Sequence, residues 1–301
     1  MRTPSPPRNR RCIGSPKSRQ AGMKSLSPPR GREPVSIKKA YRPALPDGRV
    51  CIDIYEHFSH MTKIGSGSFS SVYKCREVKT EKIGCIKILD ATRAFHCMDE
   101  EKILRKVQGH ESVCRLLDAF MCFETHLPVL FLELLEDLPV KMLPCDMLKM
   151  LQQMCLALDH IWGSQFVHND VKPANILRKP SHNVYVLTDF GSSFVASTSV
   201  VANDVSGDAY YLASDRFQGQ ALEDYHKIDV YALGVTAVEK LVGSGPDKWG
   251  MYSGFYSPAG AKEAALLMVA ESTGREKLIL EWMLKPQEER PLAFQLSDIL
   301  G

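Results

Sequence analysis

The sequence predicts an α+β fold of two lobes, in which a small β-rich lobe with one main helix precedes a larger, mainly helical lobe. Strand-like segments flank a glycine-rich turn between residues 64 and 89, apolar residues repeat at helical spacing over 147–161, and the segment 229–235 is apolar almost all round. The chain has 301 residues, 44% of them apolar, which suffices for the core of one or two domains. We place the small lobe at 55–133 and the large lobe at 134–301.

The first 54 residues differ in composition from the rest. Residues 1–50 contain 13 Lys and Arg against two acidic residues, a balance of +11, whereas the remaining 25 basic and 33 acidic residues give −8. The segment is rich in Pro and Ser and nearly lacks large apolar side chains, so it cannot offset the entropy cost of ordering. We therefore predict a disordered basic arm at 1–54. The acidity of the remainder argues against nucleic-acid binding by the folded part.

The nine cysteines are scattered from Cys12 to Cys155 without a C-x-x-C pair. An odd number in this pattern favours reduced thiols in a cytosolic or nuclear compartment over a disulfide framework or a zinc site. No apolar run approaches the roughly 18 residues of a membrane span, and the N-terminus lacks the apolar segment of a signal peptide. We expect a soluble intracellular protein without a membrane span.

A strand, a glycine-rich turn and a second strand are predicted from Ile64 onward. Gly65 and Gly67 let the backbone approach phosphate groups because they have no Cβ, and Val72 follows the turn. A third glycine, common in phosphate-binding turns of this kind, is replaced by Ser70. Taken alone, the pattern also fits an ordinary Gly/Ser hairpin.

Lys87 lies in the next predicted strand, 84–89, fifteen residues after Val72. A lysine there can reach the α- and β-phosphates of a nucleotide held under the glycine turn, the alternative being a solvated strand lysine. A helix is predicted next, because one carboxylate and three apolar residues follow helical spacing: Glu100, Ile103, Leu104 and Val107.

Glu100 heads this apolar stripe, where an unpaired carboxylate would be costly, so we expect an ion pair between Glu100 and Lys87. Glu101 competes for this role but lies about 100° around the helix from the stripe. The apolar strand at 129–136 then runs into a connector. Backbone groups from Glu133 to Leu135 would contact the edge of a nucleotide base there. The side chain of Leu132 would restrict access to the pocket behind the base.

Asp146 is expected to cap a long helix that ends at Gly163. The apolar side chains of this helix repeat at helical spacing and are predicted to be core: Met147, Leu148, Leu151, Met154, Cys155, Leu158 and Ile161. The apolar segment 229–235 is predicted to be a buried helix. Asp229 at its start would cap backbone groups of the loop that begins at His168.

The side chains that could carry out catalysis lie in that loop and in the Asp-Phe-Gly sequence after the apolar strand 184–188. Phosphoryl transfer from a metal-bound nucleotide depends on positioning and charge. Asp170 would accept the proton of the attacking hydroxyl, and Lys172 would lie against the moving phosphoryl group. Asn175 and Asp189 would hold Mg²⁺. The alternative is a solvated turn with unrelated charges.

These motifs, in this order and spacing, resemble the eukaryotic protein kinase family from Phe58 to Gly301. The resemblance implies the two-lobed protein kinase fold, ATP with Mg²⁺ as cofactors, and a protein hydroxyl as acceptor. It implies that Lys87 and Glu100 orient the nucleotide. It also implies an activation loop at 191–207, closed by an ion pair between Asp215 and Arg290.

A narrower similarity is to the Wee/Myt kinases. It rests on Gly207-Asp208 with Tyr211-Leu212-Ala213, on the run 245–249, and on Asn169, which stands where most kinases have Arg before the catalytic Asp. The resemblance implies a cyclin-dependent kinase–cyclin complex as partner and its inhibitory tyrosine as substrate. Because the chain stops at Gly301 without an apolar segment, we expect the soluble, nuclear Wee type, with the cytoplasm as the alternative location.

Two other interpretations stay open. Lys172 by itself favours a Ser/Thr-directed kinase of another subfamily. A pseudokinase scaffold, which binds partners without catalysis, is the interpretation from a different class. A scaffold is disfavoured because all five catalytic positions have the residue types that phosphoryl transfer needs: Lys87, Glu100, Asp170, Asn175 and Asp189.

Overall fold

The computed structural model describes residues 50–67, 70–89, 94–180, 183–196, 208, 210–213, 225–249 and 274–301, without the side chains of 94–99 and 248–249. Residues 42–301 form one compact unit. The predicted arm therefore lies outside the described residues up to position 49. Ser214 and Asp215, and most of the predicted activation loop, also lie outside them.

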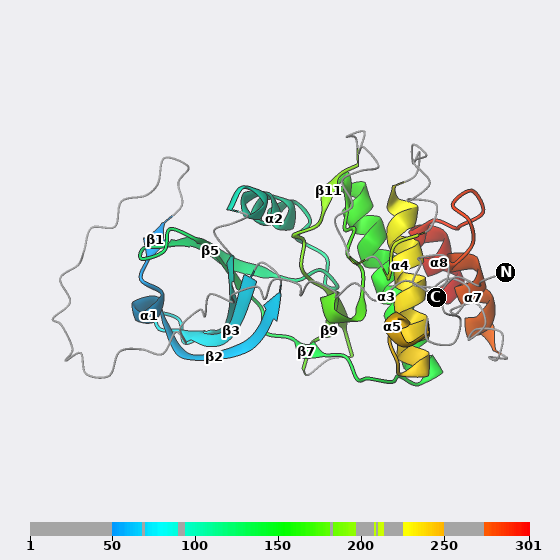
Figure 1. The fold of residues 1–301 in the computed structure, drawn as a ribbon, viewed down its shortest axis with the longest axis horizontal. Helices are drawn as coiled ribbons and strands as arrows, with labels where there is room; N and C mark the ends of the chain where they lie inside the picture. The colour runs from blue at the N-terminus through cyan, green and yellow to red at the C-terminus, as the bar shows by residue number, and fades with distance from the viewer. Residues whose placement is uncertain are drawn as a thin grey trace, which may run out of the picture. The chain divides into compact units, whose positions relative to one another are not determined.

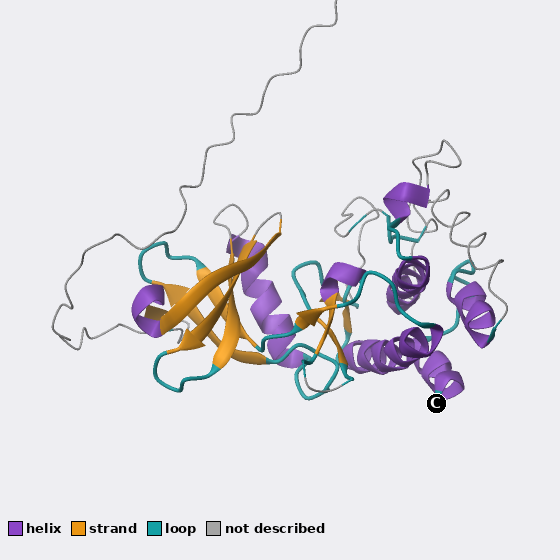
Figure 2. Cartoon of the chain, turned by 90° about the horizontal axis from the view of Figure 1, so that it is seen from below, coloured by secondary structure: helices purple, strands orange, loops and turns teal. Residues whose placement is uncertain are grey.

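The N-terminal part of the described chain is a six-stranded sheet with one main helix beside it (Figures 1 and 2). The strand order is β1-β5-β6-β4-β3-β2, and every neighbouring pair is antiparallel except β1 with β5. The strands are β1 Cys51–Ile52, β2 Phe58–Gly67, β3 Ser70–Glu77, β4 Ile83–Leu89, β5 Leu116–Cys122 and β6 Pro128–Leu132. The helix is α2, Ala94–Lys106. The predicted β-rich lobe with one main helix is confirmed.

The described secondary structure begins before Phe58, and its first strand lies inside the segment predicted to be the arm. β1 pairs with β5, and the short helix α1, Ile54–His57, follows it. The Asp53 carboxylate accepts the backbone N–H groups of Tyr55 and Glu56, and Ile52 is buried in the core of the sheet. A two-residue strand is too short for a periodic signal, which is why the sequence pattern missed it.

The helical part is built around α3, Pro144–Gly163, and α4, His226–Val242. Their apolar faces are buried as predicted, and α4 is buried almost all round. The expectation that Asp146 caps α3 is wrong. The helix begins at Pro144 after Leu143, without a side-chain cap, since proline at a first helical position has no N–H to satisfy. Asp146 lies in the first turn, where its charge suits the helix dipole.

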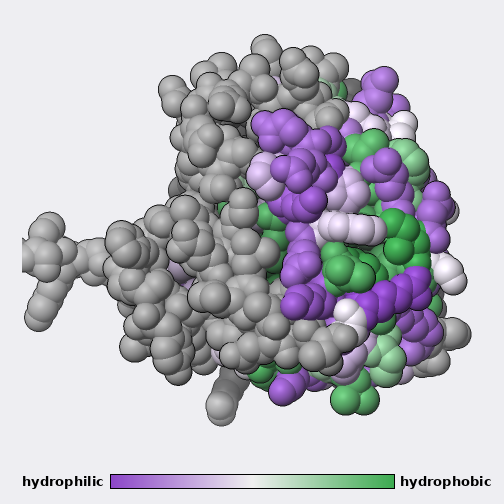
Figure 3. Space-filling view, turned by 90° about the vertical axis from the view of Figure 1, so that its right-hand side faces the viewer, coloured by the Kyte–Doolittle hydropathy of each residue, from purple (hydrophilic) through white to green (hydrophobic). Residues whose placement is uncertain are grey.

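Further helices complete this part: α5 Pro246–Trp249, α7 Arg275–Met283 and α8 Ala293–Leu300. α7 and α8 bury Ile279, Leu280 and Leu296 and leave Leu278 and Trp282 exposed. Figure 3 shows this end of the molecule, with hydrophobic and hydrophilic side chains interspersed. No helix within the described ranges is long and apolar enough to cross a membrane.

Short strands, all of them except β7 lying between α3 and α4 in the chain, position the loops that carry the predicted site. β8, Phe166–Val167, pairs with β11, Phe194–Val195. β9 lies between β7 and β10 in a three-stranded sheet: β7 Glu136–Asp137, β9 Ile176–Arg178 and β10 Tyr185–Leu187. The loop after β8 and the segment after β10 are thereby anchored at both ends. Leu104 and Val107 belong to the same core cluster as α3, so α2 packs against this region.

Candidate active site

Three strands bring the predicted phosphate-binding residues to one level of the sheet. Val72 on β3 pairs with Gly65 on β2 and with Lys87 on β4. An added Cβ at Gly65 or Gly67 would meet described protein atoms no closer than 3.8 Å and 3.5 Å, and neither glycine has a positive φ. The fold therefore does not require glycine at either place, which fits a turn kept clear for a ligand. Ile64 is half exposed beside this turn.

Lys87 links three elements of the fold. Its Nζ lies 2.7 Å from Glu100 Oε1 on α2 and 2.8 Å from Asp189 Oδ1 after β10. The expected ion pair with Glu100 is present, whereas Glu101 pairs with Arg105 on the outer side of α2. Helical spacing therefore selected the correct one of two adjacent carboxylates.

The charges in this trio are set by burial and mutual attraction. Burial disfavours the protonated amine of Lys87, but Glu100 and Asp189 outweigh it and raise the pKa of Lys87. Burial likewise disfavours the carboxylate of Asp189, yet Lys87 and the Gly191 N–H more than compensate, so its pKa is lowered. The amine and the Asp189 carboxylate are therefore both charged at neutral pH.

The connector after β6 presents backbone groups as predicted for base recognition. The N–H of Glu133 donates to the carbonyl of Arg115, 3.1 Å away. The carbonyl of Glu133 accepts a weak hydrogen bond from Cys85 Sγ at 3.5 Å, and its second lone pair can accept from a ligand. Within the described residues the N–H of Leu135 has no hydrogen-bond partner. Leu132 is partly buried and packs against the helical core. The pair of backbone groups, one acceptor and one donor, suits the edge of a purine base.

Asp170 is the centre of the loop after β8. Its Oδ2 accepts hydrogen bonds from Asn175 Nδ2 at 2.9 Å and lies 3.1 Å from Lys172 Nζ. Its Oδ1 accepts the backbone N–H of Asp208 at 3.2 Å. The predicted base, amine and amide are thus brought together by direct contacts. Asp208 was not predicted as a site residue; its presence in the Gly207-Asp208 pattern was the only signal.

Asp229 holds the backbone of this loop as predicted. Its two carboxylate oxygens accept the N–H groups of His168 and Asn169 at 2.8 and 2.7 Å. The ring of His168 accepts the Asp170 N–H at Nδ1, so its Nε2 carries the proton and donates to the Thr188 carbonyl. The buried histidine thereby connects the two halves of the site. Its partners assign this tautomer.

Asn175 and Asp189, the predicted metal ligands, lie on segments that are joined by a backbone hydrogen bond next to Asp189. The N–H of Thr188 donates to the carbonyl of Asn175 at 2.8 Å. Asn175 uses its amide nitrogen on Asp170, which leaves Oδ1 as a ligand atom. The described contacts of Asp189 go to Oδ1, which leaves Oδ2.

This donor pair fits magnesium. Mg²⁺ is usually held by one or two carboxylates together with water and nucleotide phosphates, whereas all-protein cages are uncommon. Consistently, no group of three or more His, Cys, Asp or Glu that could hold a metal by itself occurs among the described residues. The residues present therefore suit an ion that arrives with a nucleotide.

The ion pair predicted for Arg290 involves Asp215, which lies outside the described residues. In the structure, Arg290 donates to the carbonyls of Lys227 and Lys285 and lies 4.9 Å from the ring centre of Tyr231. It therefore fastens the chain after α7 to the start of α4.

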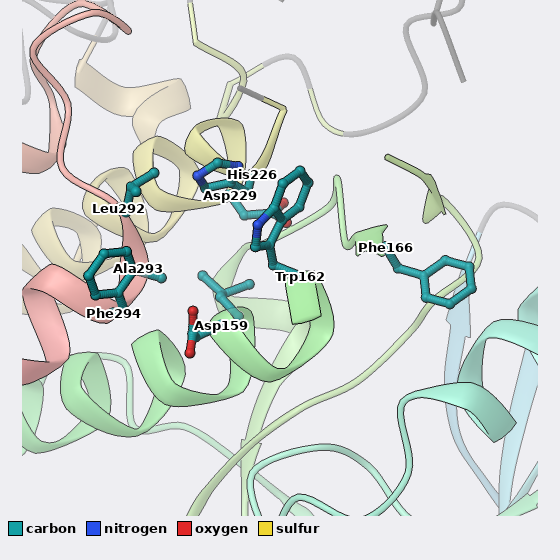
Figure 4. A pocket seen from close by; sticks show the side chains of 9 residues that line it. Asp159, Trp162, Phe166, His226, Asp229, Leu292, Ala293 and Phe294 are labelled. Carbon is teal, nitrogen blue, oxygen red and sulfur yellow. The ribbon is translucent and has the colours of Figure 1, made fainter. Parts of the chain in front are cut away.

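A pocket lies behind the loop, between the end of α3 and the starts of α4 and α8 (Figure 4). Trp162 and His226, which both line it, pack against each other with their ring centres 4.1 Å apart. Among the described residues that line it, Asp229 alone also belongs to the site described above. None of the predicted nucleotide or metal ligands lines it.

Comparison with known proteins points to one family. Residues 58–253 match the family model described as "Protein kinase domain". The chain is 32% identical over 205 residues to "Serine/threonine-protein kinase TIO" of Arabidopsis thaliana, covering 64% of this chain and 15% of that protein. It is 28% identical to "Serine/threonine-protein kinase PrkC" of Bacillus subtilis, covering 61% and 30%. It is 29% identical to "Aurora kinase" of Saccharomyces cerevisiae, covering 61% and 52%. The chain thus spans about half the length of the Aurora kinase and less than a third of the length of the other two relatives.

Proposed function

The chain belongs to the protein kinase family, and from that premise we propose that it is an active enzyme that phosphorylates the inhibitory tyrosine of a mitotic cyclin-dependent kinase. The observation that carries the catalytic part is the trio of Lys87, Glu100 and Asp189, with contacts of 2.7 and 2.8 Å. In protein kinases this lysine–glutamate pair must be formed for phosphoryl transfer. A pseudokinase scaffold would not need it.

Bound ATP with Mg²⁺, the cofactors that protein kinases use, would supply the phosphoryl group and neutralise its charge. Lys87 orients the α- and β-phosphates, held in place by Glu100. The Asp170 carboxylate accepts the proton of the attacking protein hydroxyl, and the Lys172 amine contacts the transferred group. Asn175 and Asp189 would hold the metal through the side-chain oxygens that their described contacts leave open. Glu133 and Leu135 contribute one backbone acceptor and one donor to the base.

The substrate proposal rests on sequence likeness to the Wee/Myt kinases. The described part of the likeness comprises Asn169, Asp208, the sequence Tyr211-Leu212-Ala213 and the run 245–249, which contains α5. The partner would be a cyclin-dependent kinase–cyclin complex. The nucleus, where such substrates act, is the proposed location, with the cytoplasm as the alternative.

A Ser/Thr-directed activity is the second candidate, and two observations favour it. Lys172 lies 3.1 Å from Asp170, as the lysine of a Ser/Thr kinase loop would. The relatives TIO and PrkC are named as serine/threonine-protein kinases.

The deciding experiment is phosphorylation of a recombinant cyclin-dependent kinase–cyclin complex by the full chain, followed by phosphoamino-acid analysis. Phosphotyrosine in the substrate, lost in Asp170→Asn, supports the proposal. A general base contributes about 10²–10⁴-fold, so the loss should be large. Phosphoserine alone would remove the tyrosine proposal, and equal rates for wild type and Asp170→Asn would remove catalysis by this site.

A further inference from the structure

The described segment around Asp208 touches both reactive side chains of the loop after β8. The backbone N–H of Asp208 donates to Asp170 Oδ1 at 3.2 Å. The Asp208 Oδ2 atom lies 3.7 Å from Lys172 Nζ, and Asp170 Oδ2 lies 3.1 Å from the same nitrogen. Lys172 is therefore held between two carboxylates from parts of the chain about 40 residues apart.

The Asp208 side chain is itself oriented by local hydrogen bonds. Its Oδ1 accepts the N–H of Tyr210 at 3.2 Å, and its carbonyl accepts the N–H of Tyr211 at 3.0 Å. The hydroxyl of Tyr211 in turn donates to Glu239 on α4. With Oδ1 fixed in this turn, Oδ2 is the atom turned toward Lys172. The carboxylate is anchored to the helical core through this chain of contacts.

We propose that Asp208 is a positioning residue for phosphoryl transfer, acting through Lys172. This inference rests on the proposed kinase activity. A lysine has several rotatable bonds and considerable rotamer entropy, so a single ion pair leaves its amine free to move. Two carboxylates fix the amine beside Asp170, and its three N–H donors still leave one for the transferred group. Small displacements of such groups are costly, about a hundredfold in rate for 1 Å.

The first test is kinetic, with Asp208→Asn in the full chain. Asparagine retains an oxygen for the Tyr210 N–H but removes the charge that faces Lys172. We expect kcat to fall by about tenfold or more while KM for ATP changes less than about twofold. Asp208→Glu should restore part of the rate because it retains the carboxylate. The control is Glu136→Gln, which removes one carboxylate from the exposed ion pair with Arg178 and should leave kcat unchanged.

A double-mutant cycle tests whether the effect passes through Lys172. In a Lys172→Met background, Asp208→Asn should cause little further loss, because the amine that it positions is already gone. An undiminished further loss would overturn the proposal, as would an unchanged or faster Asp208→Asn enzyme.

A readout independent of activity separates this proposal from the proposed function. A water-soluble carbodiimide joins amines to carboxylates in contact, so peptide mapping should find a Lys172–Asp208 crosslink that Asp208→Asn abolishes. Absence of this crosslink, with Lys172 still joined to Asp170, would overturn the contact. A crosslinked wild type that transfers no phosphoryl group would overturn the proposed function and the positioning role with it, while the contact would stand.

Discussion

Asn169 Nδ2 donates a hydrogen bond of 3.0 Å to the backbone carbonyl of Ser192, tying the loop before Asp170 to the segment that follows Asp189. Asn169 has φ of +67°, a left-handed conformation that asparagine tolerates better than most residues. In many kinases an arginine at this place pairs with a phosphate on the activation loop. The neutral amide of Asn169 cannot form an ion pair with a phosphate, but its hydrogen bond to Ser192 connects the two segments without one.

The first prediction is that activity does not depend on activation-loop phosphorylation. The amide link of Asn169 needs no added charge, so treating the active protein with a phosphatase should leave its rate unchanged within about twofold. The measurement is the initial rate before and after treatment, with removal of phosphate checked by mass spectrometry. A large loss of rate would contradict the prediction.

Asn169→Ala should lower both activity and stability. It deletes the hydrogen bond to Ser192 and places an alanine in the left-handed region, together costing about 1–3 kcal/mol of unfolding free energy. Asn169→Asp still tolerates this conformation, but its carboxylate is an acceptor that faces the Ser192 carbonyl. It should therefore hold the segment around Ser192 no better than Asn169→Ala does. Thermal unfolding and kcat are the measurements. An alanine variant as stable and active as the wild type would show that the link is unimportant.

Glu100→Gln should reduce kcat/KM by about tenfold or more, because Lys87 loses a buried charged partner at 2.7 Å and is left to Asp189. Glu101→Gln is the matched control one residue along. It removes an i,i+4 surface pair with Arg105 that is worth only about 0.3–0.5 kcal/mol, so its activity should stay within twofold. Equal losses in the two variants would refute the assignment of Glu100.

Asp229→Ala should destabilise the protein by about 2–5 kcal/mol, since two buried N–H groups, those of His168 and Asn169, lose their acceptors. Asp229→Asn keeps one acceptor oxygen and should lose less. Denaturant unfolding measures both. Asp298→Asn, an exposed acid on α8, is the control and should change stability by no more than about 0.5 kcal/mol. A tolerated Asp229→Ala would mean that the loop holds its shape without this carboxylate.

His110 should make stability depend on pH below neutrality. Burial lowers the pKa of His110 from 6.5, the charge of neighbouring His160 lowers it further, and Glu111 opposes them. Its Nδ1 accepts the Ser112 N–H at 3.1 Å, which protonation would prevent. The unfolded chain therefore takes up this proton first as the pH falls. The stabilising contribution is present above pH 6.5 and is lost as the pH falls below it toward the folded-state pKa.

The measurement for His110 is the free energy of unfolding between pH 7 and pH 5. His110→Asn keeps an acceptor for Ser112 but does not titrate, so the decline in this range should be smaller. His126→Asn is the control, because His126 is exposed and has a positive φ that asparagine tolerates. An identical pH slope in wild type and His110→Asn would exclude His110 as its source.

The sequence alone determined those parts of the protein that depend on local periodicity. The glycine-rich turn with its strand-like flanks located the sheet strands around Gly65 and Lys87, and helical spacing located the helix α2 and the buried stripe of α3. They also separated Glu100 from Glu101, since adjacent helical residues point in different directions. Asp229 was predictable because a carboxylate at the start of a buried helix must find donors.

Only the tertiary structure decided the contacts made between loops. The pairing of β1 with β5, the link from Asn169 to Ser192, and the placement of Asp208 against Lys172 all join segments whose own sequences have no periodic signal. Such contacts follow from how the surrounding elements pack and where each loop leaves its anchors, which the order of residues along the chain does not express. The start of α3 at Pro144, two residues before the predicted cap Asp146, is a further feature that the tertiary structure decided.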